Sequence, residues 1–543
     1  MLDFFLSVAY CDPARGKPWV VNLEQGAVRG YKEPGQSYYG FFGIPYARAP
    51  TGQNRFKAPL PAPKWKDTLE ATNRYLLCPQ NPMLVPLLKD NRNFIMSENC
   101  LNVNIYVPDT KETNLPVVVY IHGGAFQIGF GDMLRHTPLV ETGRVIVVNF
   151  NYRQGAHGFL CLGTEDVPGN AGLKDQLAAL KWVKNNIANF KGNPDEVTLA
   201  GYSGGSVAAN LLMLSEAASG LFNKVISESG PPNAVWGIQA DPIANAKQFA
   251  AMHNFNEVDD ILALEKFYKS ASLDILLSDT FFVTKDTAMT FVPCVEKPGS
   301  EGAVLTDVPI NILKKGAFNK IPIFIGFANN EGMFRLPLFD LWKGDMNDNF
   351  SNFLPADLQF STSAEKFKVS EDIREFYFSD KKISEETVNG YVDYFTDSIY
   401  ASSTMRFIES YLKNGGNKVY LYKYSFVDKN QQYLHNFKGT NHCAQSATVS
   451  RSAFEDDGDD ISEEYKILKE NHVKIWTNFI TNSKPVLENS SLFPSGWPET
   501  SLENEYYVDL NVVPELRNSL LKDRMAFWDR IYNKFYRIPV SPK

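Results

Sequence analysis

Short apolar runs of strand length alternate with longer amphipathic stretches along this chain. The strand-like runs are 115–121, 144–149, 196–200, 321–327 and 418–424. Residues 171–189 carry apolar side chains at helical spacing, namely Leu173, Leu177, Leu180 and Ile187. Continuous apolar strands are typical of a parallel sheet that is buried on both faces. The pattern therefore predicts an α/β fold with a large, mostly parallel central sheet and helices on both faces.

Two long segments interrupt this alternation, at about 233–287 and about 336–382. We expect these insertions to cover the edge of the sheet where its strands end and to shape a pocket there. The chain contains no linker, repeat or low-complexity stretch, so we predict one domain over residues 1–543. A helical run at 515–531 is expected to pack onto this domain or to form a dimer contact, which leaves a monomer and a homodimer both open.

Composition and charge narrow the range of partners. The chain has 543 residues, of which 44% are apolar, enough to bury a large core. A net charge of −8 argues against nucleic acid as a partner. No apolar run approaches the roughly 18 residues of a membrane span. Because the sequence lacks an HExxH motif, a CxxC cluster and a glycine-rich phosphate loop, we expect no metal and no cofactor.

The N-terminus and two glycosylation motifs bear on the compartment. Residues 1–11 resemble the end of a secretion signal, but their apolar part is short and lacks a basic start, so they are a signal remnant or a tail. Asn349 and Asn489 begin Asn-x-Ser motifs that permit glycosylation in a secretory setting. These features favour the secretory pathway and leave the cytoplasm open.

Residues 201–205 read Gly-Tyr-Ser-Gly-Gly and join a strand-like run to a helix-like run at 206–214. In such a Gly-x-Ser-x-Gly turn the serine is held exposed on strained backbone. The flanking glycines stand where a side chain would strike the neighbouring strand or helix. We therefore predict that Ser203 is a nucleophile. The run 115–121 ends in His122-Gly123-Gly124, a loop whose backbone N–H groups suit an oxyanion.

An α/β-hydrolase needs an acid and then a histidine after its nucleophile. Glu331 follows the strand-like run 321–327, where a catalytic carboxylate is expected. Among the seven histidines, His435 and His442 follow the next strand-like run, whereas His472 lies in register within a helical run and is expected to pack there. A glycine-led loop favours His442 as the base and leaves His435 as the alternative.

Motifs spread over nearly the whole chain carry a resemblance to a known family. They are FGIPYA at 42–47, GQNRF at 52–56, SENCLNVNI at 97–105, HGGAF at 122–126, NYR at 151–153, PGNAGLKDQ at 168–176, SESG at 227–230, FVPCVE at 291–296, WTNF at 476–479 and WP at 497–498. With these motifs the chain resembles the type-B carboxylesterases of the cholinesterase/carboxylesterase family, most of all insect carboxylesterases. The resemblance implies an α/β-hydrolase fold.

The resemblance also implies a serine carboxylesterase that needs no cofactor and works through an acyl-enzyme. Its catalytic triad would be Ser203, Glu331 and His442, and its oxyanion donors would be the N–H groups of Gly123, Gly124 and Gly204. The family's N-terminal disulfide would join Cys78 to Cys100. The substrate would be a small ester of xenobiotic, dietary or odorant and pheromone type.

The remaining cysteines are read from their surroundings. Cys161 and Cys294 sit in apolar runs and are expected to be buried thiols. Cys443, next to the base, is expected to line the site.

Departures from the family pattern bear on the substrate. Tyr202 stands before the nucleophile, where the family has Glu or Gln, and Gly204 stands where it has Ala. Between Cys78 and Cys100 the sole aromatic residue is Phe94, so the tryptophan that holds a cationic alcohol in cholinesterases is missing. We therefore expect uncharged esters. The alternatives are a juvenile hormone esterase-like enzyme and a non-catalytic binding or adhesion relative.

Overall fold

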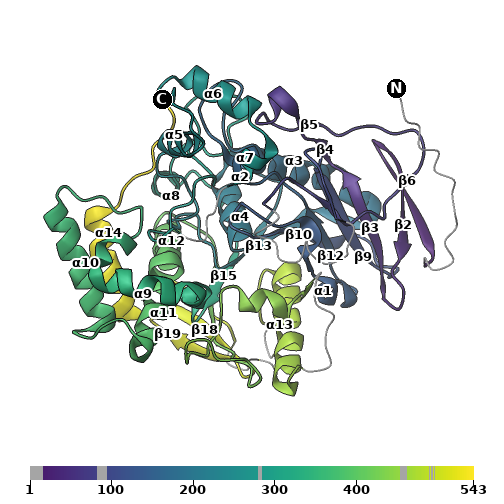
Figure 1. Cartoon of the computed structure of the whole chain (residues 1–543). Helices are drawn as coiled ribbons and strands as arrows, with labels where there is room; N and C mark the ends of the chain where they lie inside the picture. The colour runs from purple at the N-terminus through teal and green to yellow at the C-terminus, as the bar shows by residue number, and fades with distance from the viewer. Residues whose placement is uncertain are drawn as a thin grey trace.

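The computed structural model describes residues 16–81, 94–278, 284–452, 461–487, 490, 493 and 496–543. Within these residues, thirteen strands form one sheet (Figure 1), in the order β1-β2-β3-β9-β12-β10-β13-β14-β15-β16-β18-β19, with β6 beside β2. In that order the strands are β1 (Pro18–Leu23), β2 (Gly26–Lys32), β3 (Tyr38–Pro45), β9 (Asn102–Pro108), β12 (Ile146–Phe150), β10 (Leu115–Ile121), β13 (Gly192–Tyr202), β14 (Lys224–Glu228), β15 (Ile323–Ala328), β16 (Val419–Tyr424), β18 (Tyr506–Leu510) and β19 (Glu515–Asn518), and β6 is Leu69–Glu70.

The central strands run parallel and end at a common edge. From β12 through β10, β13, β14, β15 and β16 to β18 the pairing is parallel. The strands at both margins pair antiparallel, except that β6 pairs parallel with β2. Tyr202 at the end of β13 lies opposite Glu228 at the end of β14. Open α/β sheets bind ligands at this edge. The predicted mostly parallel sheet is confirmed.

Helices cover both faces of the sheet, as predicted. Alternate residues of a strand point to opposite faces. In β10, Val117 and Val119 pack in the core that holds α3 and α4, whereas Val118 and Tyr120 pack in the core that holds α13. Figure 1 shows α13 on one side of the central strands and α4 on the other. The α-helices of the described residues are α1 (Thr137–Glu141), α2 (Gly155–Phe159), α3 (Ala171–Asn186), α4 (Gly204–Leu214), α5 (Pro242–Met252), α6 (Ile261–Ser270), α7 (Leu273–Leu276), α8 (Pro309–Lys315), α9 (Phe339–Asp348), α10 (Ser363–Phe378), α11 (Val388–Thr396), α12 (Ser402–Lys413), α13 (Glu463–Asn482) and α14 (Lys522–Phe535).

The C-terminal run differs from its prediction. Residues 515–531 begin as strand β19, whose Glu515 pairs with Asp509 of β18. Ser519 and Leu521 then take positive φ angles, and α14 begins only at Lys522. The prediction of one helix over 515–531 is wrong because pairing with β18, rather than local propensity, decides the conformation of its first residues.

The two insertions carry helices, and residues of the first line the cavity above the site. α5, α6 and α7 lie in the first, and α9 and α10 lie in the second. Trp236 and Thr287, near the two ends of the first insertion, line the cavity described below. In the second, Phe376 of α10 stacks on Phe527 of α14 with 4.1 Å between ring centroids, at the far end of the molecule from β2 (Figure 1).

Two disulfides tie distant parts of the chain together. Cys78 pairs with Cys100, the bond that the family resemblance implies. Cys161 pairs with Cys294 as well, so the prediction that these two residues are buried thiols is wrong. The chain brings the two apolar runs together across 133 residues, and Asn170 fixes the second run by hydrogen bonds to the backbone of Cys294. A pairing over that separation leaves no local sequence signal.

The expectations about the N-terminus, the glycosylation motifs and a membrane span can be compared with the structure only where it describes the residues concerned. Residues 1–11 and Asn489 lie outside them. Asn349 lies within them and is exposed. No helix in the described part of the chain is long and apolar enough to cross a membrane.

Candidate active site

Ser203 occupies a sharp turn between β13 and α4. Its backbone has φ 51° and ψ −124°, a strained conformation that turns the chain directly from strand into helix. The glycines beside it are required by space. A Cβ on Gly201 would stand 2.4 Å from the backbone of Gly205, and one on Gly205 would stand 2.1 Å from the carbonyl oxygen of Ile121.

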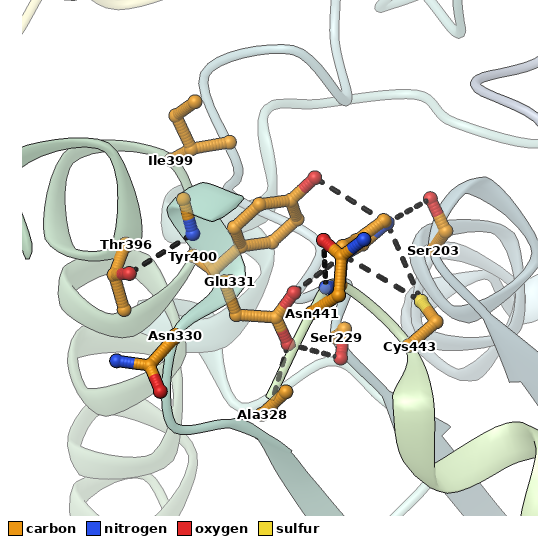
Figure 2. Close-up of polar contacts among 12 residues, drawn as sticks. Ser203, Ser229, Ala328, Asn330, Glu331, Thr396, Ile399, Tyr400, Asn441 and Cys443 are labelled. Carbon is orange, nitrogen blue, oxygen red and sulfur yellow. Dashed lines mark hydrogen bonds and ion pairs between the residues drawn. The ribbon is translucent and has the colours of Figure 1, made fainter. Parts of the chain in front are cut away.

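The three residues of the predicted triad lie in contact, Ser203 with His442 and His442 with Glu331. Ser203 Oγ is 2.9 Å from His442 Nε2, and His442 Nδ1 contacts Glu331 Oε2 (Figure 2). Glu331 is fully buried, whereas the side chain of His442 keeps 17% exposure toward the cavity. The three side chains come from the ends of β13 and β15 and from the loop after β16, which the parallel sheet brings to one edge.

The other oxygen of Glu331 is held from two sides. The backbone N–H of Ala328 donates to Oε1 at 2.7 Å, and the Ser229 hydroxyl donates to it at 2.5 Å (Figure 2). Gln445 in turn donates to Ser229 Oγ at 2.8 Å. These hydrogen bonds leave Oε2 directed at the imidazole and fix its orientation.

A second carboxyl group, that of Glu228, is buried behind the triad. It accepts a hydrogen bond from the Ser446 hydroxyl at 2.8 Å. Burial raises the pKa of Glu228 to about 8, and the charge of Glu331 adds to this rise. Glu228 is therefore protonated at neutral pH, and the negative charge beside the imidazole is that of Glu331.

The oxyanion loop follows β10. Gly124 takes φ 106°, and a Cβ there would stand 2.0 Å from the carbonyl oxygen of Ile128. Gly124 and Ala125 line the cavity, and a Cβ on Gly204 would stand 3.2 Å from the amide nitrogen of Ala125. Gly123, expected as a donor, is not among the described residues that line this cavity and instead packs against the Tyr202 ring. Ala125, which the sequence analysis did not name, thus lies at the edge of the cavity beside Gly204.

The cavity above Ser203 is small and mostly apolar, with a volume of about 190 Å³. Its wall consists of Gly124, Ala125, Tyr202, Ser203, Trp236, Thr287, Met289, Phe334, Arg335, Ile399, Tyr400, His442 and Cys443. Arg335 is 2% exposed, and its guanidinium lies 4.7 Å from the centre of the Phe334 ring. Burial lowers the pKa of Arg335 to about 10, so the group is cationic at neutral pH.

Cys443 lines the cavity, as expected. Its Sγ is 3.3 Å from His442 Nε2. Burial, with the nearby charge of Glu331, raises the pKa of this thiol well above its ordinary value. Cys443 is therefore a neutral thiol beside the imidazole.

The other histidines are placed elsewhere. The Nδ1 atom of His435, the alternative base, is 3.0 Å from Glu385 Oε1 rather than beside Ser203. His472 is buried in α13, as predicted. His435, Glu385 and Asp340 group closely enough to hold a metal ion, but Lys343 already pairs with Asp340 at 2.5 Å, and we assign no metal there.

The fold and this edge of the sheet define an α/β-hydrolase, with a serine on a strained turn between a parallel strand and a helix. The model of the Carboxylesterase family matches residues 17–528. The chain belongs to the carboxylesterase family and is a carboxylic ester hydrolase.

Named relatives come from insects. Esterase-5B of Drosophila persimilis is 31% identical over 438 residues, covering 78% of this chain and 79% of that protein. Juvenile hormone esterase of Heliothis virescens is 32% identical, covering 78% of this chain and 77% of that protein. The crystal structure of juvenile hormone esterase from Manduca sexta, with OTFP covalently attached, superposes with a TM-score of 0.83 and 32% identity over 95% of this chain and 100% of that one.

Proposed function

We propose that this enzyme is a serine carboxylesterase that hydrolyses short, uncharged carboxylic esters through an acyl-enzyme. One observation carries the proposal: Ser203 Oγ lies 2.9 Å from His442 Nε2, and the other nitrogen of that ring contacts the buried Glu331, at the floor of an apolar cavity. Nucleophile, base and orienting acid in this geometry are the arrangement that activates a serine.

The mechanism follows from these contacts. Ser203 Oγ attacks the ester carbonyl carbon while His442 Nε2 takes its proton, and Glu331 stabilises the imidazolium through Nδ1–H. When the tetrahedral intermediate collapses, the C–O bond to the alcohol breaks and the alcohol oxygen receives the proton from Nε2. Water then attacks the acyl-enzyme with His442 as the base, which releases the acid and restores Ser203.

The backbone N–H groups of Gly124, Ala125 and Gly204 are the oxyanion donors in this proposal. The cavity lining and the close approach of Gly204 to Ala125 support them. A single donor of this kind stabilises the transition state by about 3 kcal/mol. The donors are backbone groups, so side-chain replacement at Ala125 leaves them in place.

Two features of the cavity support uncharged, short substrates. The described residues that line the cavity include the guanidinium of Arg335 and no carboxylate, so the wall offers no anion to attract a quaternary ammonium alcohol. The cavity volume of about 190 Å³ is below the range of roughly 300–1,000 Å³ of pockets for larger ligands. The substrates of this proposal are nitrophenyl and naphthyl acetates and butyrates, and acetylcholine is expected to be a poor substrate.

A substrate panel tests this function. We expect Ser203→Ala to lower kcat on 4-nitrophenyl butyrate by about 10⁶ because the triad acts as a unit. In the wild type, kcat/KM for 3,3-dimethylbutyl acetate should exceed that for the isosteric cation acetylcholine. A tenfold preference for acetylcholine would contradict the assignment to neutral esters, and an unimpaired Ser203→Ala enzyme would contradict the serine mechanism.

Hydrolysis of juvenile hormone is the second candidate. The names of two relatives favour it, the Heliothis virescens enzyme and the Manduca sexta enzyme. The small cavity favours the first candidate. Comparing kcat/KM for juvenile hormone with that for 4-nitrophenyl butyrate decides between them, because a hormone esterase should prefer the hormone by orders of magnitude.

A secretory location also belongs to this proposal. The disulfides Cys78–Cys100 and Cys161–Cys294 support it, because such bonds persist in oxidising compartments. Glycosidase treatment of the protein from its native source tests it. A mass shift at the exposed Asn349 is the expected result, and an unmodified protein with free thiols would contradict it.

A further inference from the structure

A π-helical turn interrupts the helical segment that covers the triad. α11 and α12 are joined by η11 (Asp397–Ala401), which is wound as a π-helix. Such turns are rare, weaken the regular hydrogen-bond ladder and occur often at functional sites. This turn carries Ile399 and Tyr400, which both line the cavity. The question is what the chain gains by placing a tyrosine there.

The π-helical turn is anchored firmly on both sides. Before it, Thr396 Oγ1 accepts a hydrogen bond from the N–H of Gly332, next to the catalytic acid (Figure 2). At its first residue, the buried Asp397 receives two hydrogen bonds from Arg524 of α14, at 2.5 and 2.6 Å. Within it, the Ile399 carbonyl accepts from the Trp236 indole at 3.3 Å. The position of Tyr400 is therefore fixed relative to the triad.

Tyr400 and Ser203 approach the same nitrogen of the base. The Tyr400 hydroxyl is 3.4 Å from His442 Nε2, and Ser203 Oγ is 2.9 Å from it (Figure 2). The Tyr400 ring also stacks on the imidazole, with 4.6 Å between centroids and 28° between planes. Any substrate oxygen that takes the Nε2 proton must come within hydrogen-bond distance of Nε2, where it meets the phenol as well as the weaker donor Cys443, whose Sγ is 3.3 Å from Nε2.

We propose that Tyr400 is a catalytic residue that donates a hydrogen bond to the departing alcohol oxygen of the ester. The inference rests on the proposed serine mechanism. As the C–O bond of the tetrahedral intermediate breaks, its electron pair goes to the alcohol oxygen, and the proton that neutralises that oxygen comes from His442 Nε2. The Tyr400 proton stays on the phenol, and its hydrogen bond stabilises the charge that builds before the transfer is complete.

The surroundings of Tyr400 keep its hydroxyl protonated, so that it can donate a hydrogen bond. Tyr400 is 4% exposed, and burial together with the charge of Glu331 raises its pKa well above the ordinary value. It therefore stays protonated at any pH at which the base is functional. The stabilisation matters most for a poor leaving group, because an alkoxide carries more charge in the transition state than a nitrophenolate.

The test compares two esters of one acid in the variant Tyr400→Phe, which keeps the stacked ring and removes only the hydroxyl. We expect kcat/KM for ethyl butyrate to fall about tenfold or more, and kcat/KM for 4-nitrophenyl butyrate to change less than twofold. The ratio of the two values, measured on one sample, does not depend on the folded fraction of that sample. The initial burst of nitrophenol counts the competent sites.

Tyr394→Phe is the matched control. It removes another buried hydroxyl from the same helical segment, one that donates to the Phe353 carbonyl at 2.5 Å rather than lining the cavity. We expect it to leave the ratio of the two kcat/KM values unchanged. Equal losses on both esters in Tyr400→Phe, or no loss on either, would overturn the inference. Either outcome leaves the serine mechanism standing, since that mechanism fails only if Ser203→Ala stays active.

Discussion

On the sheet side of the catalytic cavity, backbone geometry positions the reacting groups, whereas on the covering side packed side chains form the wall. Ser203 and Gly124 both sit at positive φ, in turns where added atoms would strike neighbouring backbone. Phe334 and Tyr400 are instead held by ring packing and by anchors on distant helices. Backbone conformation thus positions the nucleophile and the loop after β10, whereas the wall opposite, Tyr400 included, consists of side chains that can be exchanged one at a time.

Substitution of two neighbouring glycines, Gly204 and Gly205, is expected to have the largest effect on the sheet side of the cavity. A Cβ on Gly205 would stand 2.1 Å from the backbone oxygen of Ile121, whereas one on Gly204 would stand 3.2 Å from two amide nitrogens. We expect Gly205→Ala to lower kcat/KM on 4-nitrophenyl butyrate more than 100-fold, or to prevent folding, because backbone must move at the nucleophile. Gly204→Ala should stay within about tenfold of the wild type. Equal activity of the two variants would contradict the claim that backbone contact sets this side.

The disulfide Cys161–Cys294 links the segment after α2 to the segment that follows the first insertion. It closes a loop of 133 residues, against 22 for Cys78–Cys100. The chain-entropy model assigns about 5 kcal/mol to the longer loop and about 3.4 kcal/mol to the shorter. In urea unfolding, the double variant Cys161→Ser with Cys294→Ser should therefore lose more stability than Cys78→Ser with Cys100→Ser. The reverse order would show that native packing, rather than loop closure, decides the effect.

The charge on the covering side can be removed at Arg335. Arg335→Met keeps most of the buried volume and removes the cation from the wall. We expect the ratio of kcat/KM for acetylcholine to that for 3,3-dimethylbutyl acetate to rise about tenfold, a change of about 1.4 kcal/mol in the transition state. The expected change lies in the ratio rather than in overall activity. An unchanged ratio would mean that the guanidinium does not act on the alcohol part of the substrate.

We expect the stability to depend on pH because His472 is buried in the core on the α13 face of the sheet. Burial lowers the pKa of His472 to about 3, whereas an unfolded histidine titrates near 6.5. Between about pH 6.5 and 3 the unfolded state thus binds a proton that the folded state does not, so the free energy of unfolding falls as pH falls. His472→Gln should reduce this slope by about 1.4 kcal/mol per pH unit in urea titrations between pH 6 and 4. If the slope for His472→Gln equalled that of the wild type, a group other than His472 would be taking up the proton on unfolding.

The difference between the sheet side and the covering side of the cavity also determines which residues could be predicted from the sequence. The parallel strands and the serine turn follow from local patterns. Ser203 and Glu331 could be placed because they follow closely on β13 and β15, and His442 because it lies in the loop after β16 of the same sheet. The covering residues Arg335 and Tyr400 lack such a signal, since their place depends on contacts between segments far apart in the chain, such as that of Asp397 with Arg524.

The errors share that cause. The Cys161–Cys294 bond spans 133 residues, and the strand at 515–518 exists only because β18 lies beside it. The place of Ala125 at the cavity was not predicted either, because it depends on a loop in which Ala125 and Phe126 both take positive φ, a conformation that is uncommon for these residue types.

Mapping the covalent adduct of an organophosphate tests the central claim most directly. The wild-type enzyme is inactivated with diisopropyl fluorophosphate, and the modified peptide is identified by mass spectrometry. The account predicts one phosphoryl group per chain, on Ser203, with loss of activity in proportion to its incorporation. Inactivation with the phosphoryl group on another residue, or full activity with Ser203 modified, would contradict it.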